Sequence, residues 1–338
     1  MMGPGTHTTG GRAERDGLAG RRVLVTGGAG FIGAHLVRAL LAHGASVTVV
    51  DDLSSPSSAG VPDSATLATV RLPDPGFPSI LAEGRFDLVF HLAGASYVPP
   101  SVDDPLSDLR NNTEVTLHVL EGLRRFSPGS RLVYTSSAAV YGSPQKLPIA
   151  EDDPPAPVSP YGVSKLAAEA YVSLYARLHG LHTASLRLFS VYGPGQRKQV
   201  VYDLMGKLMA DPHRLEVHGT GLESRDFLHV EDVVDAALLV MTSGQLTGEV
   251  YNVASGESLD IQTLVEAIAE TLQVRPKVQF TGRLRPGDAR VWVADIGRLR
   301  SLGFSPSVGL RKGLTTVLEW IGAWPPDDEG MAGRSPKR

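Results

Sequence analysis

The sequence predicts an α/β fold in which a doubly wound parallel sheet is followed by a smaller C-terminal lobe. Short apolar runs alternate with stretches of helical spacing up to about residue 190, and a glycine-rich turn joins the first such pair. Beyond residue 191 the elements become shorter and are separated by turn residues. With 338 residues, 42% of them hydrophobic, the chain is long enough for two lobes.

The glycine-rich turn lies between an expected strand at residues 22–25 and an expected helix at residues 34–41. Gly27, Gly30 and Gly33 are three residues apart, which permits a tight turn and brings the backbone close to a pyrophosphate at the helix N-terminus. This is typical of a Rossmann-type dinucleotide site, although the same turn can join a strand to a helix without binding anything.

The next expected strand, at residues 46–50, strengthens the dinucleotide interpretation. It ends in Asp51 and Asp52, about twenty residues after the glycines. A carboxylate at that place can accept hydrogen bonds from an adenosine ribose, so we expect one of the two to bind the cofactor.

The remaining elements follow the same alternation. Further strands are expected at residues 67–70, 87–91, 131–135 and 184–189, and long helices at 105–126 and 161–179. After residue 191 we expect helices at 200–209, 231–241, 259–272 and 310–320 and a strand at 250–253. Residues 21–190 are therefore predicted to form the dinucleotide-binding domain, and residues 191–324 a substrate lobe, some of whose elements return to the first sheet.

Composition narrows the partners and the location. The net charge of −4 and the absence of a basic run argue against nucleic acid. No apolar stretch approaches the length of a membrane span, and residues 1–20 lack a signal-peptide core, so we expect them to be a disordered leader. Residues 325–338 are expected to be a disordered tail. The chain has no cysteine, which is compatible with the cytoplasm, and its ten histidines have no metal-ligand spacing, so no metal is predicted.

Tyr161 and Lys165 form a candidate catalytic pair. Four residues apart on a helix, they lie on one face, where the ammonium favours the phenolate and so a general base. An isolated pair of this kind also occurs on ordinary helix surfaces. The hydroxyls of Thr135, Ser136 and Ser137, at the end of the expected strand 131–135 and just past it, lie at the edge where open α/β sheets bind ligands.

These motifs together resemble the extended short-chain dehydrogenases/reductases of the nucleotide-sugar epimerase/dehydratase family, and most of all its UDP-glucose 4-epimerase-like members. The resemblance runs from residue 23 to about residue 320. The matching segments, in family order, are residues 26–33, 91–94, 134–142, 161–165, 188–196, 219–221 with 225–227, and 285–288.

The resemblance implies NAD as cofactor and a nucleotide-diphosphate sugar as substrate. It implies that Ser137 hydrogen-bonds the reacting sugar hydroxyl, that Tyr161 removes its proton, and that Lys165 binds the nicotinamide ribose. It implies that Asp51 accepts hydrogen bonds from the adenosine ribose, and further cofactor contacts are expected from Phe31, Ile32, Leu92, Ala93 and Gly94. Substrate contacts are expected from Ser190, Arg197, Arg225, Arg285, Asp288 and Trp292, with Arg225 and Arg285 on the diphosphate. Arginines in surface ion pairs are the ordinary alternative.

Departures from the family pattern narrow the reaction. Family dehydratases carry an Asp-Glu pair where this chain has Ala138 and Ala139, so elimination of water is not expected. Asp51 and Asp52 would repel a ribose 2′-phosphate, which favours NAD over NADP. Arg71 stands where many relatives have an acid near adenine, and Ser190 where they often have Asn.

Three further residues bear on the identity of the sugar. The bulk of Trp292 favours an unacetylated sugar. Arg197 and Lys198 could face an anionic group such as a hexuronate carboxylate, although a solvated pair of basic residues in a loop is an equal alternative.

The expected activity is therefore reversible epimerisation of a nucleotide-diphosphate sugar at C4 through a transient 4-keto intermediate. A 4-ketoreductase or dehydrogenase with net redox change, and a hexuronate 4-epimerase, are alternatives in the same fold. A dinucleotide-sensing protein without catalysis is an alternative from another class. The apolar surface of helices 105–126 and 161–179, which relatives pair across a dimer axis, predicts a homodimer.

Overall fold

The computed structural model describes residues 17–54, 60–283 and 291–322, and it confirms the predicted α/β fold. A seven-stranded parallel sheet has the order β11-β6-β5-β4-β1-β2-β3. Each of the expected strands up to residue 189 is present within a few residues of its predicted position. The strands are β1 (Arg22–Thr26), β2 (Ser46–Asp51), β3 (Thr66–Thr69), β4 (Leu88–His91), β5 (Arg131–Ser137), β6 (His182–Leu188) and β11 (Thr247–Val253).

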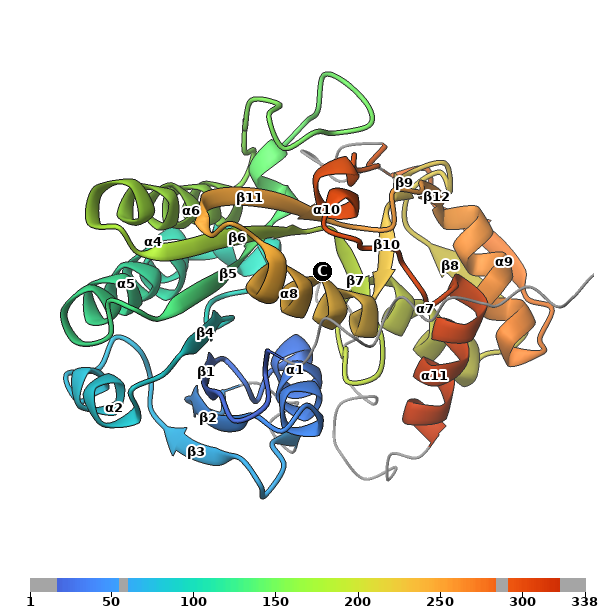
Figure 1. The fold of residues 1–338 in the computed structure, drawn as a ribbon. Helices are drawn as coiled ribbons and strands as arrows, with labels where there is room; N and C mark the ends of the chain where they lie inside the picture. Colours follow the sequence, from blue (N-terminus) through green and yellow to red (C-terminus); the bar gives the residue numbers. More distant parts are fainter. Residues whose placement is uncertain (1–16, 55–59, 284–290, 323–338) are drawn as a thin grey trace, which may run out of the picture.

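Helices cover both faces of the sheet (Figure 1). On one face α1 (Phe31–Ala42) and α8 (Val230–Ser243) pack side by side on a core of aliphatic residues. On the other face lie α2 (Phe77–Gly84), α5 (Val115–Phe126) and α6 (Pro160–His179). Because strands buried on both faces need apolar side chains in both directions, their near-continuous apolar runs were a reliable signal.

The expected helix at residues 105–126 is one helical run with an irregular middle. It consists of α4 (Pro105–Leu109), a π-helical segment η2 (Arg110–Glu114) and α5. The Asn112 carbonyl oxygen in this segment accepts a hydrogen bond from Thr116 Oγ1 in the first turn of α5 at 2.7 Å. Such π-helical turns occur often beside functional sites.

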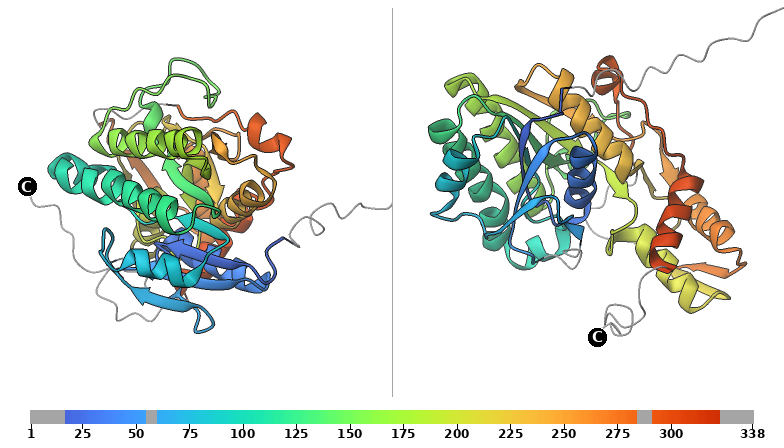
Figure 2. Two further views of the ribbon diagram at one scale, coloured as in Figure 1. Left: turned by 60° about the vertical axis from the view of Figure 1, so that its left-hand side comes forward. Right: turned by 60° about the horizontal axis from the view of Figure 1, so that its bottom comes forward.

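The second lobe has its own apolar core, built by α7 (Gln199–Ala210), α9 (Ile261–Leu272) and α11 (Leu310–Gly322) with the paired strands β8 (Arg214–Val217) and β13 (Lys277–Phe280). Figure 2 shows this lobe beside the large sheet. Two short pairs connect the lobes: β7 (Ser190–Tyr192) with β10 (Phe227–His229), and β9 (Ser224–Arg225) with β12 (Leu259–Asp260). Although they follow residue 191, β11 and α8 pack in the first lobe.

The structure corrects the boundary of the leader. Residues 17–20 form a turn in which the side chain of Leu18 is fully buried in the first core. The Gly20 amide donates to the Gly44 carbonyl oxygen at 2.9 Å, which ties this turn to the loop before β2. Residues 17–20 therefore belong to the folded part of the chain. No sequence pattern indicated this, because Leu18 is a single apolar residue in a polar stretch. The rest of the predicted leader, and the tail from residue 325, lie outside the described residues.

Several elements were not expected from the sequence. Besides the short pairs β7–β10 and β9–β12, they include α2, α3 (Val98–Asp103), α10 (Gly297–Ser301), β8 and β13. Three are helices of eight residues or fewer, and β8 and β13 are half-exposed strands of four residues. Elements this short carry little periodicity, and their pairing is set by tertiary contacts.

The parallel register brings the site residues to one edge of the sheet. Thr26 lies opposite His91, and His91 opposite Tyr134, so β1 and β4 end at the same level and β5 runs three residues further, to Ser137. His91 Nδ1 and Nε2 contact the hydroxyls of Thr26 and Thr116 at 2.7 and 3.1 Å. Complete burial lowers the pKa of His91 to about 3, so a neutral imidazole joins both strands to α5.

Candidate active site

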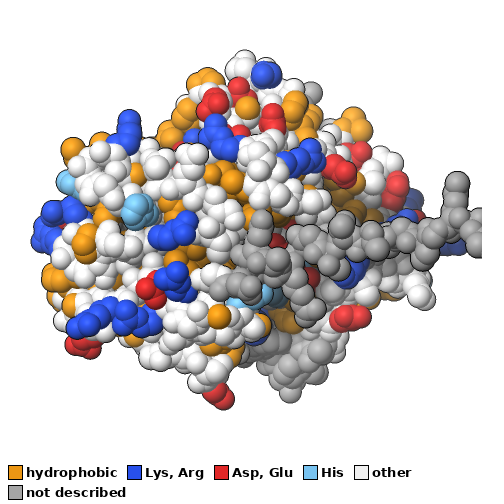
Figure 3. Space-filling model, viewed as in Figure 1, with side chains coloured by type: hydrophobic (Ala, Val, Ile, Leu, Met, Phe, Trp, Pro, Cys, Tyr) orange, Lys and Arg blue, Asp and Glu red, His pale blue; other side chains and the backbone are white. Residues whose placement is uncertain are grey.

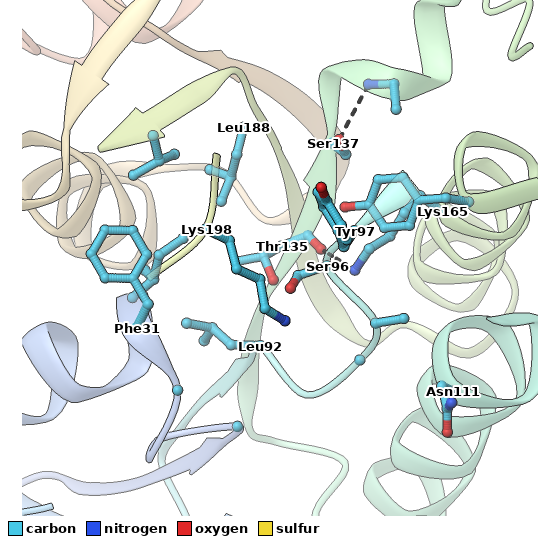
Figure 4. Close-up of a pocket in the computed structure, with 18 of the residues that line it drawn as sticks. Phe31, Leu92, Ser96, Tyr97, Asn111, Thr135, Ser137, Lys165, Leu188 and Lys198 are labelled. Atoms are coloured by element: carbon cyan, nitrogen blue, oxygen red, sulfur yellow. Dashed lines mark hydrogen bonds between the residues drawn. The ribbon is translucent and has the colours of Figure 1, made fainter. Parts of the chain in front are cut away.

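A cleft of about 860 Å³ lies at the carboxyl edge of the large sheet, between the two lobes. Figure 4 shows Thr135, Ser137 and Lys165 on one side of it, with Phe31 and Lys198 across from them. The cleft is lined by every predicted site residue that the structure describes: Gly27, Gly30, Phe31, Ile32, Gly33, Asp51, Leu92, Ala93, Gly94, Ser137, Tyr161, Lys165, Ser190, Arg197, Arg225 and Trp292. The predicted residues Arg285 and Asp288 lie outside the described residues.

At one end of the cleft the glycine turn packs too closely for side chains. Gly27 has φ of +73°, and a Cβ atom there would lie 2.6 Å from the backbone nitrogen of Ala93. A Cβ atom on Gly33 would collide with the Gly27 carbonyl oxygen. Helix α1 begins directly after Gly30, which supplies no side-chain cap, so its first N–H groups meet the cleft. This cradle fits the pyrophosphate of a dinucleotide.

Asp51 lies at the end of β2, beside this turn. Its Oδ2 accepts from the Ala29 amide at 2.9 Å and its Oδ1 from the Leu53 amide at 2.8 Å, which fixes the carboxylate in place. Each oxygen keeps a further lone pair, as binding of ribose hydroxyls requires. The neighbouring Asp52 is 3.9 Å from the guanidinium of Arg71, across the same end of the cleft.

At the other end, the start of α6 fixes Tyr161. Ser159 is the N-cap and accepts from the Gly162 amide at 3.1 Å, and Pro160 occupies the first helical position. The Tyr161 amide donates to Ser101 Oγ at 3.1 Å, a contact from α3 that the sequence did not suggest. These contacts fix the N-terminus of α6 directly before Tyr161, whose side chain lines the cleft.

Lys165 and Ser137 lie at the same end of the cleft as Tyr161. Lys165 Nζ donates to the Thr135 carbonyl oxygen at 3.1 Å and lies 6.0 Å from the centre of the Tyr161 ring. Ser137 ends β5 and caps the short helix η3 (Ala138–Tyr141), with its Oγ accepting from the Ala139 amide at 3.2 Å (Figure 4). The strand end, the short helix and α6 thus bring a hydroxyl, a phenol and an ammonium together.

Burial governs the ionisation of this group. It raises the pKa of Tyr161 to about 12, although a hydrogen bond from Ser137 favours the phenolate. It also lowers the pKa of Lys165 to about 8. In this state the tyrosine keeps its proton at neutral pH, and additional positive charge beside the phenol would lower its pKa.

A polar cluster buried behind Tyr161 and Lys165 was not anticipated. Asn112 Nδ2 donates to Asp108 Oδ1 and to Ser164 Oγ, both at 3.1 Å, and Ser164 Oγ donates to Asp108 Oδ2 at 2.5 Å. Asp108 and Asn112 lie in the helical run 105–126 and Ser164 lies in α6. No spacing rule connects two helices 50 residues apart, so the sequence carried no signal for this cluster.

The substrate end of the cleft combines aromatic and basic side chains. The Trp292 ring packs edge-on against Phe189, with ring centres 5.9 Å apart. Arg225 Nη1 donates to the Ser224 carbonyl oxygen at 2.8 Å, and Lys198 Nζ lies 5.9 Å from the centre of the Tyr97 ring. Ser96 and Tyr97 also line the cleft, and the signal that could have found them is their place two and three residues after the motif at residues 91–94.

Three properties concern the described part of the chain as a whole: its helix lengths, its possible metal ligands and its surface charge. Among residues 17–54, 60–283 and 291–322, no helix has the length and apolarity needed to cross a membrane, and no group of three or more acidic or histidine side chains could hold a metal ion. On the face drawn in Figure 3, basic and acidic side chains are interspersed.

The fold and the cleft define a class: an α/β protein with a dinucleotide cradle and a serine, a tyrosine and a lysine at the far end of the same cleft. The chain belongs to the NAD-dependent epimerase/dehydratase family, whose model matches residues 23–254.

Individual relatives agree over almost the whole chain. It is 35% identical over 311 residues to the UDP-glucose 4-epimerase of Mycolicibacterium smegmatis, an alignment that covers 89% of this chain and 98% of the relative. The UDP-glucose 4-epimerase of Thermus thermophilus, solved in complex with NAD, is 34% identical with a TM-score of 0.82 and covers 90% of this chain and 100% of its own. MoeE5, solved in complex with UDP-glucuronic acid and NAD, is 37% identical with a TM-score of 0.78 and covers 89% and 98%.

Proposed function

We propose that this protein is an NAD-dependent epimerase that inverts C4 of a nucleotide-diphosphate sugar through a transient 4-keto intermediate. The observation that carries the proposal is the approach of Ser137, Tyr161 and Lys165 at one end of a cleft whose other end is a dinucleotide cradle. The alanines Ala138 and Ala139, which directly follow Ser137, provide no acid or base for elimination of water. The similar proteins named UDP-glucose 4-epimerase support the same reaction.

Gly27, residues 30–33, Asp51 and residues 92–94, all of which line the cleft, would hold NAD. Asp51 would accept hydrogen bonds from the adenosine ribose, and the N-terminus of α1 would bind the pyrophosphate. When bound, the nicotinamide supplies the hydride acceptor and donor that inversion at C4 requires. Its positive charge in the oxidised form also favours ionisation of the nearby phenol.

The chain's own residues move the proton. Tyr161 takes the proton of the C4 hydroxyl, Ser137 donates a hydrogen bond to that oxygen, and the Lys165 ammonium stabilises the phenolate and binds the nicotinamide ribose. After C4 is oxidised, the 4-keto sugar turns in the cleft, and Tyr161 returns the proton when the opposite face is reduced. Proton transfer of this kind accounts for about 10²–10⁴-fold of rate.

The second lobe provides the substrate contacts. Arg225 and Arg285 clamp the diphosphate, with Asp288 in the same segment, while Ser190, Arg197 and Trp292 contact the sugar side of the substrate. Accordingly, the expected NAD-binding domain, extended back to residue 17, runs to residue 190, and residues 191–324 serve mainly as the substrate lobe.

A hexuronate is the second candidate substrate, because Arg197 and Lys198 line the cleft and Lys198 reaches the Tyr97 ring. A carboxylate on the sugar would meet positive charge there. MoeE5, the similar protein solved with UDP-glucuronic acid, makes this candidate worth a direct comparison. The ratio of kcat/KM for UDP-glucuronate and UDP-glucose decides between the two: a ratio above one favours the hexuronate.

The experiment that tests the proposal is incubation of the purified protein with NAD and a panel of UDP- and dTDP-sugars, followed by chromatography of the products. We expect the C4 epimer of at least one sugar without accumulation of reduced nicotinamide. Stoichiometric growth of the reduced-nicotinamide absorbance would instead identify a net oxidoreductase. A protein that binds NAD and converts none of these sugars would indicate a dinucleotide sensor.

We also propose a cytoplasmic homodimer. Apolar side chains stay exposed on the outer surfaces of α4, α5 and α6, which lie next to one another: Leu106, Leu109, Phe126, Val163, Leu174 and Leu178. Two copies that pair these helices would cover them. Sedimentation that finds a monomer at micromolar concentration would contradict the dimer.

A further inference from the structure

Asp108 is a buried carboxylate next to the catalytic group proposed above. Its side chain is 4% exposed, on the last turn of α4. The hydrogen-bond donors that reach its two oxygens, Asn112 Nδ2 and Ser164 Oγ, belong to neutral side chains. Because burying a carboxylate without a cation nearby is costly, this position calls for a compensating charge.

The geometry points to Lys165 as the source of that charge. Ser164, which donates to Asp108, is the residue immediately before Lys165. On the other side, the Cβ position of Gly94 lies 2.7 Å from Asn112 Oδ1 and 3.6 Å from Lys165 Nζ. The amide nitrogen of the same Asn112 side chain donates to Asp108. The cluster therefore extends from Asp108 to the immediate surroundings of the ammonium.

The other charged and titratable groups around Lys165 do not take this role. Glu169, one turn further along α6, is held by the guanidinium of Arg187 from β6. From the sheet, His91 is neutral and Tyr134 presents its ring 5.1 Å from Nζ. Tyr161 lies on α6 itself. Glu121 of α5 bonds to Arg124, Arg125 and Tyr175, towards the far end of α6.

We propose that Asp108 is the counter-ion of Lys165, a positioning residue that keeps the lysine ammonium charged inside a buried site. The proposal rests on the proposed function, in which that ammonium binds the nicotinamide ribose and stabilises the Tyr161 phenolate. Asp108 touches neither substrate nor cofactor. It acts through Lys165, from behind the cleft.

The negative charge of Asp108 raises the pKa of both Lys165 and Tyr161. Burial lowers the pKa of Lys165 to about 8, and the charge of Asp108 opposes that shift. Burial raises the pKa of Tyr161 to about 12, and the charge of Asp108 adds to that shift. Removing the negative charge of Asp108 therefore lowers the pKa of Lys165 and that of Tyr161, each by about one unit, as expected for the loss of one nearby buried charge.

The test is the pH dependence of NAD affinity and of epimerisation in Asp108→Asn and Asp108→Ser. In the wild-type protein we expect NAD affinity to decrease as the pH rises through about 8, where Lys165 loses its proton. In both neutral variants the decrease should begin about one pH unit lower, and both limbs of the kcat profile should move to lower pH. NAD binding needs no sugar, so this result stands even if the proposed epimerisation is wrong.

Three matched variants separate charge from structure. Asp108→Glu keeps the charge and should restore the wild-type limbs, while Glu114→Gln removes an exposed carboxylate on the same helical run and should move none of them. Ser164→Ala removes a hydrogen bond to Asp108 but no charge, so it should lower Tm and leave the limbs in place. Neutral variants that lower Tm but keep the wild-type pH profile would overturn the proposal.

A measurement on the wild-type protein covers the case in which the neutral variants do not fold. NMR of lysine labelled with carbon-13, with the signal assigned by comparison with Lys165→Met, gives the titration of Lys165 directly. We expect a midpoint at or above pH 8, as the counter-ion requires. A midpoint well below 8 would mean that no carboxylate supports the ammonium.

Discussion

Lys165 Nζ donates a hydrogen bond to the carbonyl oxygen of Thr135 at 3.1 Å, and this contact joins helix α6 to the end of the central strand β5. It aims the ammonium at the cleft and holds α6 at the level where β5 delivers Ser137. The arrangement brings the hydroxyl of Ser137 and the phenol of Tyr161 into the same cleft, as the proposed reaction at one sugar hydroxyl requires.

Tyr161→Phe should lower kcat by about 10²–10⁴-fold, because it removes the group that exchanges the proton while keeping the buried ring. NAD affinity and Tm should change little. The matched control is Tyr171→Phe on the outer part of the same helix, where the ring is partly exposed. A Tyr161→Phe enzyme with near-normal turnover would exclude the tyrosine as the base.

Gly27→Ala should weaken NAD binding at least tenfold and destabilise the fold by about 1–3 kcal/mol. The new Cβ would require a left-handed backbone and would lie 2.6 Å from the Ala93 nitrogen, at the centre of the cradle. Calorimetric titration with NAD and a denaturation curve measure both effects. Gly17→Ala, which adds a Cβ to open space, should leave both unchanged.

Glu169→Gln should cost about 3–5 kcal/mol of unfolding free energy, because it leaves the buried guanidinium of Arg187 without its counter-charge. The exposed pair Asp203–Lys207 is the comparison, and Asp203→Asn should cost no more than about 0.5 kcal/mol. Urea denaturation measures both variants. Equal losses of unfolding free energy in Glu169→Gln and Asp203→Asn would show that the buried pair stabilises the fold no more than the exposed one.

Stability should decrease as the pH falls from about 6.5 towards 3, with part of the loss due to His91. Burial lowers the folded-state pKa of this histidine to about 3. Between pH 6.5 and 3 the unfolded chain therefore binds a proton at His91 while the folded protein keeps the imidazole neutral, and this difference favours unfolding. The loss is absent above the unfolded-state pKa. In His91→Gln, the slope of unfolding free energy against pH should be smaller over the same window; an unchanged slope would contradict the neutral, buried state.

The sequence predicted those parts of the site that depend on local rules. The turn at Gly27, Gly30 and Gly33 and the pair Tyr161–Lys165 are short-range patterns, since each is fixed by the geometry of one turn or one helix. The common edge of the parallel strands located the carboxylates at residues 51–52 and the hydroxyls at residues 135–137, and the family resemblance then selected Asp51 and Ser137 among them. These positions could therefore be placed in the cleft before any three-dimensional information.

Other parts depend on contacts between distant segments. The burial of Asp108 requires knowing that α4 packs against α6, and the role of Ser101 requires that α3 lies at the start of α6. Leu18 is a single apolar residue in a polar stretch, so no periodicity marks it as core. For such residues the sequence gives the chemistry of the side chain, and tertiary packing decides where it lies.

The most direct test of the account follows the hydrogen at C4. UDP-glucose carrying deuterium at C4 is incubated with the protein and catalytic NAD, and the product is examined by NMR and mass spectrometry; UDP-glucuronate labelled in the same way serves as the parallel substrate. We predict the C4 epimer with its deuterium retained and no net reduced nicotinamide. Loss of the deuterium to solvent, or a keto sugar released with an equivalent of reduced cofactor, would contradict epimerisation at C4.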